Sequence, residues 1–166
     1  MTLYYGLLHL WLHVADSEGA IRALSGIFAV LTVPVIYLLG GRLFGPIAGA
    51  LAAITFAVNA FVVEYAQEAR SYSLVTLLVT LSSYFFVSEL LHPSRWTRVA
   101  YVATSVLAMY AHFFAMWILM VQLLTLLFFR RDVLLTRRWL SVVGAIGLGY
   151  LPAAAQIARF GHANIG

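Results

Sequence analysis

A short polar stretch, YAQEARSY at residues 65–72, lies between two long apolar stretches and contains residue types found in active sites. A carboxylate such as Glu68 can act as a general base, hold a metal ion or accept hydrogen bonds from sugar hydroxyls. An arginine such as Arg70 can bind a phosphate group through two parallel hydrogen bonds. The stretch therefore predicts a functional site, and the alternative is a solvated loop with an ordinary surface ion pair.

The arrangement of these charges depends on where the preceding helix ends. Glu64 and Glu68 are four residues apart, so a continuous helix would stack two like charges, unless a cation lies between them. Arg70 would point away from Glu68 on the same helix. If the helix ends at this point, we expect Glu68 and Arg70 to face one cavity.

Other ionisable residues are weaker candidates for a site. Asp16 and Glu18 are expected in a solvated turn beside a helix N-terminus, where negative charge is favourable. His9 and His13 would share a helical face, but no third ligand is near in the sequence, so we expect an interfacial pair and not a metal site. Taken alone, His112 on an apolar hairpin is expected to be a core histidine with satisfied hydrogen bonds.

The elements that position these residues are predicted from the apolar runs. Of the 166 residues, 63% are hydrophobic and 10% are charged, whereas a soluble domain has about 25% charged residues. Apolar runs separated by short charged clusters are typical of an all-α, polytopic integral membrane protein with a single domain over residues 1–166. The expected elements are an interfacial helix over residues 3–14, crossings over 21–39, 47–63 and 72–91, two short crossings within 99–129, and a last crossing over 139–158.

The positions of the arginines decide between one and two crossings for residues 99–129. Cytoplasmic loops of membrane proteins are enriched in Lys and Arg. Two crossings, with an apex near residues 110–112, put seven arginines on one side and three on the other, whereas one crossing gives six and four. The sequence therefore favours about six crossings, with residues 65–72 on the outer side. The seven arginines on the predicted cytoplasmic side are Arg42, Arg95, Arg98, Arg130, Arg131, Arg137 and Arg138.

Composition also excludes several classes of protein. The net charge of +4 comes from arginines at the ends of apolar runs, which form no basic face, so nucleic acid is not an expected partner. The chain has no cysteine, and this excludes disulfides and a zinc-thiolate site. No basic n-region or cleavage site indicates a signal peptide. The chain starts directly in an apolar stretch and stops at ARFGHANIG without a clear structural ending, so we expect it to be an internal piece of a longer membrane protein.

Three stretches resemble one family in the same order and with similar spacing. They are LYYGLLHLWLHVADSEGAIRALSGIFAVLTVPVIYLLGGRLFG, YAQEARSYSL and MYAHFFAMWILMVQ. They resemble a bacterial group of C-type membrane glycosyltransferases, which are kin of the protein O-mannosyltransferases and of the lipid A aminoarabinose transferases. The resemblance covers nearly the whole chain, and QEAR followed by an aromatic residue is its most specific signal.

The resemblance implies a function and a set of site residues. Such enzymes transfer a sugar from a polyprenyl-phosphate carrier to a lipid, glycan or protein acceptor at the outer face of the cytoplasmic (inner) membrane. The expected reaction is a single displacement at the anomeric carbon, in which the phosphate leaves on its lipid. The resemblance implies a catalytic role for Glu68 and substrate-binding roles for Gln67, Arg70, Tyr72, Arg22 and His112.

One departure from the family pattern limits the prediction. The family has a principal acidic residue, often an Asp-Glu pair, in an outer loop that would lie upstream of Leu3. We therefore expect a glycosyltransferase core that is truncated at both ends and inactive alone. The cofactor is unknown, with a divalent metal as an open alternative. A polytopic transporter fragment and a non-catalytic membrane assembly subunit are the alternative functions, and a transporter would carry its ionisable residues nearer mid-membrane.

Overall fold

The computed structural model of the chain describes residues 2–13 and 17–163, and the side chains of residues 3–13 and 17–152. All regular secondary structure in this part of the chain is helical, which confirms the predicted all-α class. The helices are α1 (Thr2–Leu12), α2 (Glu18–Phe44), α3 (Pro46–Ala57), α4 (Ala60–Ala66), α5 (Tyr72–Leu91), α6 (Arg95–Ala111), α7 (Ala115–Phe129), α8 (Arg131–Leu134) and α9 (Arg137–Ala163).

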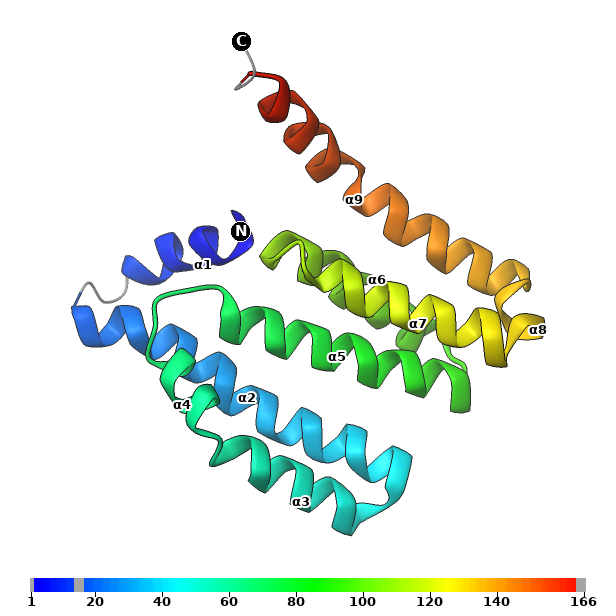
Figure 1. Ribbon diagram of the computed structural model, residues 1–166, viewed down its shortest axis with the longest axis horizontal. Coiled ribbons are helices and arrows are strands. Elements are labelled where there is room, and N and C mark those ends of the chain that lie inside the picture. The colour runs from blue at the N-terminus through cyan, green and yellow to red at the C-terminus, as the bar shows by residue number, and fades with distance from the viewer. Residues whose placement is uncertain (1, 14–16, 164–166) are drawn as a thin grey trace.

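The long helices form a bundle in which α2, α5 and α7 run in one direction and α3, α6 and α9 run in the other (Figure 1). Helices α2, α5 and α6 lie side by side in that order, α7 packs against both α5 and α6, α3 packs against α2, and α9 packs against α6 (Figure 1). The short helix α1 contacts α2 and α6 at one end of the bundle. That end also contains residues 67–71 and the α6–α7 junction, and we call it the Glu68 end. The opposite end contains the α2–α3 and α5–α6 connections and α8, and we call it the Glu89 end.

Close backbone packing joins α2 to α3. Gly45 alone connects the two helices, with a φ of 93° that favours glycine, and Pro46 starts α3. A Cβ atom on Gly49 would lie 2.6 Å from the backbone nitrogen of Gly41, and one on Gly40 would lie 2.9 Å from the Cα of Gly49. Glycine at these positions lets the two backbones touch, as small residues do between membrane helices.

The single helix expected over residues 47–63 is instead two helices. Helix α3 ends at Ala57, α4 begins at Ala60, and their axes are bent by 57°. Asn59 stabilises the break, because its side-chain oxygen accepts hydrogen bonds from the backbone N–H groups of Phe61 (3.0 Å) and Val62 (3.3 Å). Asparagine competes with the helical backbone in this way, which explains the difference from the prediction.

The other predicted elements agree with the structure in position. Helix α5 covers the predicted crossing at residues 72–91, and residues 99–129 divide at residues 112–114, close to the predicted apex. By length and composition, α2 and α5 are each able to cross a membrane, and the bent pair of α3 and α4 would be a third span. Helix α7 is apolar but has 15 residues. The full set of six crossings therefore remains a prediction.

Polar side chains pair inside the bundle between α5, α6 and α7. The hydroxyls of Ser82 and Ser105 are 2.9 Å apart. The Tyr101 hydroxyl donates to Gln122 Oε1 (2.9 Å), and Gln122 Nε2 donates to the Ser83 hydroxyl (3.2 Å). Interhelical hydrogen bonds of this kind hold membrane helices in register, because lipid offers no competing partner.

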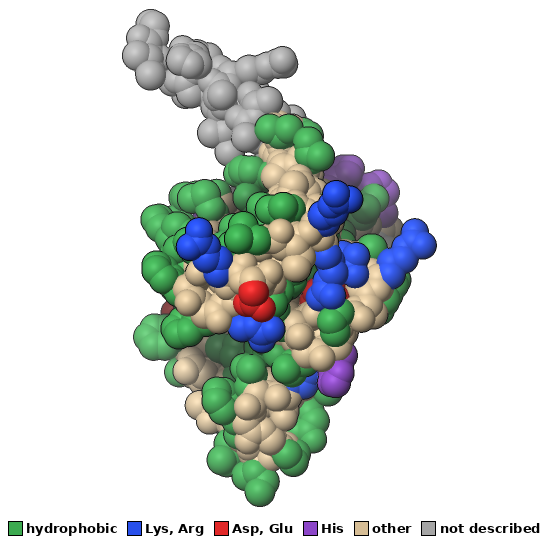
Figure 2. Space-filling view, turned by 90° about the vertical axis from the view of Figure 1, so that its right-hand side faces the viewer, with side chains coloured by type: hydrophobic (Ala, Val, Ile, Leu, Met, Phe, Trp, Pro, Cys, Tyr) green, Lys and Arg blue, Asp and Glu red, His purple; other side chains and the backbone are tan. Residues whose placement is uncertain are grey.

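A second polar cluster, centred on the fully buried Glu89, joins α5 and α6 to α9 at the Glu89 end of the bundle. Arg98 Nε donates to Glu89 Oε1 (3.1 Å), and Arg138 Nε lies 2.9 Å from the same oxygen. The other oxygen, Oε2, accepts from the Ser94 backbone N–H (3.1 Å) and from the Thr97 hydroxyl. This Glu89 cluster joins α5, α6 and α9, at the end of the bundle where arginine side chains gather (Figure 2).

Candidate functional site

The helix before the YAQEARSY stretch ends at its centre. Helix α4 stops at Ala66, and the following amides form turn hydrogen bonds, from Gln67 N–H to the Glu64 carbonyl (3.0 Å) and from Glu68 N–H to the Tyr65 carbonyl (3.3 Å). The Arg70 N–H then donates to the Glu68 carbonyl (2.8 Å). Because the chain leaves the helix here, Glu68 and Arg70 are free of helical spacing and face the same hollow.

Neighbouring helices hold this turn in place. The Ser25 hydroxyl of α2 donates to the Arg70 carbonyl (3.4 Å) and pairs with the hydroxyl of the fully buried Tyr4 (2.9 Å). Burial raises the pKa of the Tyr4 hydroxyl, so it stays neutral as a hydrogen-bonding partner. On the other flank, the Ser73 hydroxyl donates to the Tyr65 carbonyl (3.4 Å). The sequence reasoning missed the supporting roles of Tyr4 and Ser25, because they act through contacts distant in the chain.

Two open hollows lie beside the turn at the Glu68 end. Their volumes are about 460 and 440 Å³. Both are lined by Arg22, Gln67 and Glu68; Glu64 borders the first, and Arg70 borders the second. The structure therefore brings together four of the six residues that the sequence proposed for the site.

The carboxylate of Glu68 is only loosely paired. Its Oε2 atom is buried, accepts no hydrogen bond from the described residues, and lies 3.6 Å from Arg70 Nε. The Glu68 side chain is 39% exposed and that of Arg70 is 63% exposed. A hydrogen bond with the Tyr72 side chain and the charge of Glu68 raise the pKa of Arg70. Both charged groups therefore keep hydrogen-bonding capacity for a ligand.

Arg22 reaches the same hollows from α2. Ser17 caps this helix by accepting a hydrogen bond from the Ala20 N–H (3.2 Å), and Glu18 is its first residue. Arg22 pairs with Glu18 one turn earlier on an exposed face. Asp16, which the sequence placed in the same turn, lies outside the described residues. The Arg22 guanidinium thus has a carboxylate partner at the edge of the hollows.

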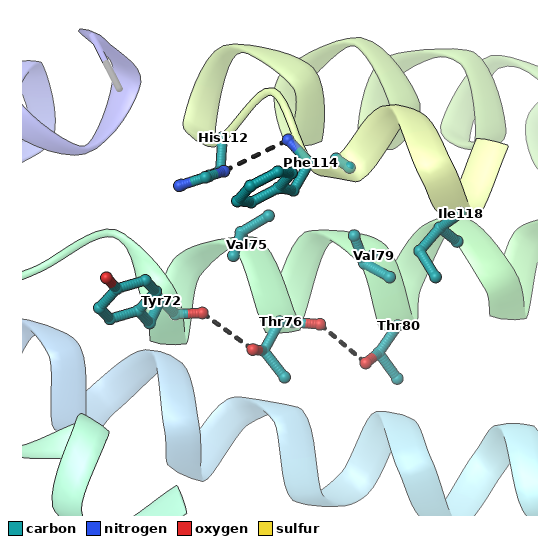
Figure 3. Close-up of a pocket in the computed structure, with 9 residues that line it drawn as sticks. Tyr72, Val75, Thr76, Val79, Thr80, His112, Phe114 and Ile118 are labelled. Carbon is teal, nitrogen blue, oxygen red and sulfur yellow. Dashed lines mark hydrogen bonds between the residues drawn. The ribbon is translucent and has the colours of Figure 1, made fainter. Parts of the chain in front are cut away.

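Tyr72 and His112 belong to a different surface, an apolar groove of about 300 Å³ between α5 and the α6–α7 junction (Figure 3). The rings of Tyr72 and His112 stack with centroids 6.4 Å apart. His112 is buried, and its Nδ1 accepts a hydrogen bond from the Phe114 N–H (3.3 Å). The hydroxyls of Thr76 and Thr80 donate to carbonyls of their own helix, so the groove wall is apolar.

Tyr72 lies between the polar and the apolar parts of the site. It follows the turn that carries Arg70, contacts Tyr65 edge to face at 5.0 Å, and lines the apolar groove. The structure thus places Tyr72 and His112 together, separate from the hollows that contain Glu68. Among the residues described, no three His, Asp or Glu side chains lie close enough to hold a metal ion. His9 and His13 contact each other edge to face at 5.1 Å.

These features define a helical membrane protein with a charged site at the end of its bundle and an apolar groove next to it. The family model described as dolichyl-phosphate-mannose-protein mannosyltransferase matches residues 4–154, and the chain belongs to this family. The match confirms the resemblance to C-type membrane glycosyltransferases, and it implies a lipid-linked sugar donor. Neither the curated proteins nor the solved structures contain a match to the chain.

Proposed function

We propose that the chain forms the core of a glycosyltransferase that moves a sugar from a polyprenyl-phosphate carrier to an acceptor at the outer face of the cytoplasmic membrane. The observation that carries this proposal is the loosely paired carboxylate of Glu68, which shares its hollows with Arg22, Gln67 and Arg70. A membrane enzyme acting on a lipid-bound phosphate needs cations at headgroup depth and an apolar path for the lipid. The groove beside Tyr72 and the two arginines supply these features.

The proposed reaction is a single displacement. An acceptor oxygen attacks the anomeric carbon of the sugar, the bond between that carbon and the phosphate oxygen breaks, and the phosphate leaves on its lipid with the electron pair. The acceptor proton passes to a carboxylate. Arg70 binds the leaving phosphate, with Arg22 at the edge of the same hollow.

We assign Glu68 the role of an active-site acid that contacts the substrate. Its unpaired oxygen can accept a hydrogen bond from an acceptor or sugar hydroxyl, and Gln67 lines the same space with an amide. We propose that Glu68 acts together with the principal acidic residue that the resemblance implies for an outer loop. A divalent cation bound by Glu68 stays an alternative, and it would need ligands beyond the described residues.

The proposed topology has six crossings, with the Glu68 end outside and the Glu89 end in the cytoplasm. Seven arginines belong to the Glu89 end and its connections, whereas Arg22 and Arg70 belong to the Glu68 end. This asymmetry agrees with the enrichment of cytoplasmic loops in arginine. The break between α3 and α4 is a feature that transporters also use, but it carries the neutral Asn59 and no charged side chain, which favours the enzyme over the transporter.

The test is Glu68→Gln in membranes that contain the protein. Gln keeps the size of Glu but loses the charge, so sugar transfer per mole of protein should fall by at least about a hundredfold. Glu64→Gln is the matched control, because Glu64 borders one of the same hollows, and it should leave most of the activity. Activity that survives in Glu68→Gln would reject the assignment and favour a non-catalytic membrane subunit.

A further inference from the structure

A second groove lies far from the proposed active site, between α6 and α9. Its volume is about 420 Å³, and its walls are Val99, Val102, Ala103, Val142 and Ala145. Arg98 and Ser141 are the polar side chains that border it. At about 1.5 Å per residue, the stretch from Arg98 to Ala103 extends roughly 7 Å along the helix. The groove therefore suits an apolar chain with a polar group at the Arg98 end.

The charge at this end of the groove is unbalanced. Arg98 and Arg138 share the single carboxylate of Glu89, so the Glu89 cluster has one positive charge more than it has negative charges. Arg98 uses only Nε for Glu89, its side chain is 33% exposed, and its terminal nitrogens have no hydrogen-bond partner among the described residues. These nitrogens are available to an anion from outside the chain.

Helix direction adds to this positive charge. Both arginines lie in the first turns of their helices, α6 and α9, where the helix dipole is already positive and a cation is unfavourable. Trp96, in the same first turn of α6, is 74% exposed. Exposed Trp at a helix end is typical of the level of the lipid headgroups. The free guanidinium nitrogens of Arg98 are thus near the depth of phospholipid phosphates.

We propose that the groove between α6 and α9 binds an anionic phospholipid, with one acyl chain along Val99, Val102 and Ala145 and the phosphate paired with Arg98. A basic pocket between membrane helices is the kind of site that binds such headgroups. The apolar walls favour a lipid over a free phosphate ion, which would gain nothing from them. This site requires only the membrane setting and is independent of the proposed transfer reaction.

The first experiment compares lipids on the whole chain in neutral detergent. Binding of phosphatidylglycerol, phosphatidylcholine and glycerol phosphate is measured by native mass spectrometry. Phosphatidylglycerol should bind roughly fivefold tighter than phosphatidylcholine, because its headgroup carries a net negative charge that pairs with Arg98, whereas the phosphatidylcholine headgroup is neutral overall. Glycerol phosphate should bind far more weakly. Equal binding of the two lipids would overturn the proposal, and so would glycerol phosphate that competes as well as phosphatidylglycerol.

Two matched pairs of variants localise the site. Arg98→Gln makes the net charge of the Glu89 cluster zero, because Arg138 still pairs with the carboxylate. This variant should lose the roughly fivefold preference for phosphatidylglycerol over phosphatidylcholine. Arg131→Gln removes one exposed charge from the same end and should keep it. Ala103→Phe fills the groove and should weaken phosphatidylglycerol binding, whereas Ala52→Phe on exposed α3 should not. Identical behaviour within either pair rejects the site. If Ala103→Phe fails to fold, Ala145→Phe on the facing helix replaces it.

Discussion

Glu68 Oε2 lies 3.6 Å from Arg70 Nε, which is too far for a hydrogen bond, and the two side chains border the same hollow. A bidentate pair would use two N–H groups along one edge of the guanidinium, but this loose pair leaves those donors open. The carboxylate still lies near enough to favour the charged form of Arg70. This geometry is therefore better suited to binding a ligand than to stabilising the fold as an ion pair.

Arg70→Lys should weaken binding of the lipid-linked donor. Lys keeps the positive charge but loses the planar fork that matches a phosphate, so we expect the KM for the donor to rise roughly tenfold with a smaller change in kcat. Steady-state transfer assays with varied donor concentration measure this. Arg22→Lys is the comparison, since Arg22 already pairs with Glu18, and it should have a smaller effect. An unchanged KM in Arg70→Lys would contradict phosphate binding at this residue.

Accessibility of single cysteines should reveal the orientation of the bundle. The chain has no cysteine, so each introduced thiol is unique. In intact cells, an impermeant maleimide should label Arg70→Cys, and it should label Arg131→Cys and Arg95→Cys only after the membrane is permeabilised. Labelling of position 131 from outside would show that residues 99–129 cross the membrane once.

Glu89→Gln should destabilise the bundle without touching the proposed active site. The change removes the one carboxylate shared by Arg98 and Arg138 and leaves partly buried cations without a counter-charge, which costs about 3 kcal/mol. Unfolding in a denaturing detergent, followed by circular dichroism, gives the free energy. Asp132→Asn is the control, because Asp132 is exposed and pairs with Arg130 at 3.7 Å, and its effect should be small. Equal stability of the two variants would contradict a stabilising role for the Glu89 cluster.

Gly49→Ala should disrupt the contact between α2 and α3. The added methyl group would meet the backbone of Gly41 at 2.6 Å, and a rigid backbone cannot move aside cheaply, so we expect a loss of about 2 kcal/mol. Gly144→Ala is the control, because nothing lies within 4 Å of its Cβ position and alanine favours the helix. Thermal unfolding in one detergent compares the two. If Gly49→Ala were as stable as the wild type, the two helices would not be held by close backbone contact.

The helices were predictable where local pattern sets them. Helix α5 begins at Tyr72 after a polar turn and ends at Leu91 before His92 and Pro93, and the prediction had the same bounds. The break before α4 escaped prediction because the residues on both sides are apolar and only Asn59 marks it. A hydropathy pattern does not distinguish a straight span from a bent one.

The contacts between distant residues were not predictable in the same way. Glu89 appears in the sequence as a lone acid near the end of an apolar run, and its partner Arg138 is 49 residues further on. An ionisable residue inside a span was nevertheless a usable signal, because such a residue needs a partner. The hydrogen bond from Ser25 to Arg70 joins residues that are 45 positions apart and ends on a backbone carbonyl, so no residue pattern predicts it.

The position of Tyr72 also bears on how reactants enter and products leave the proposed enzyme. Its ring lies on the apolar groove, and the turn before it opens on hollows that are polar. In the proposed reaction, the lipid-borne donor can therefore enter sideways from the bilayer, and the polar side of the site gives an acceptor a separate route. The lipid-linked phosphate can leave into the bilayer, and the glycosylated acceptor can leave by the route through which the acceptor entered. The two products therefore do not depend on a single exit.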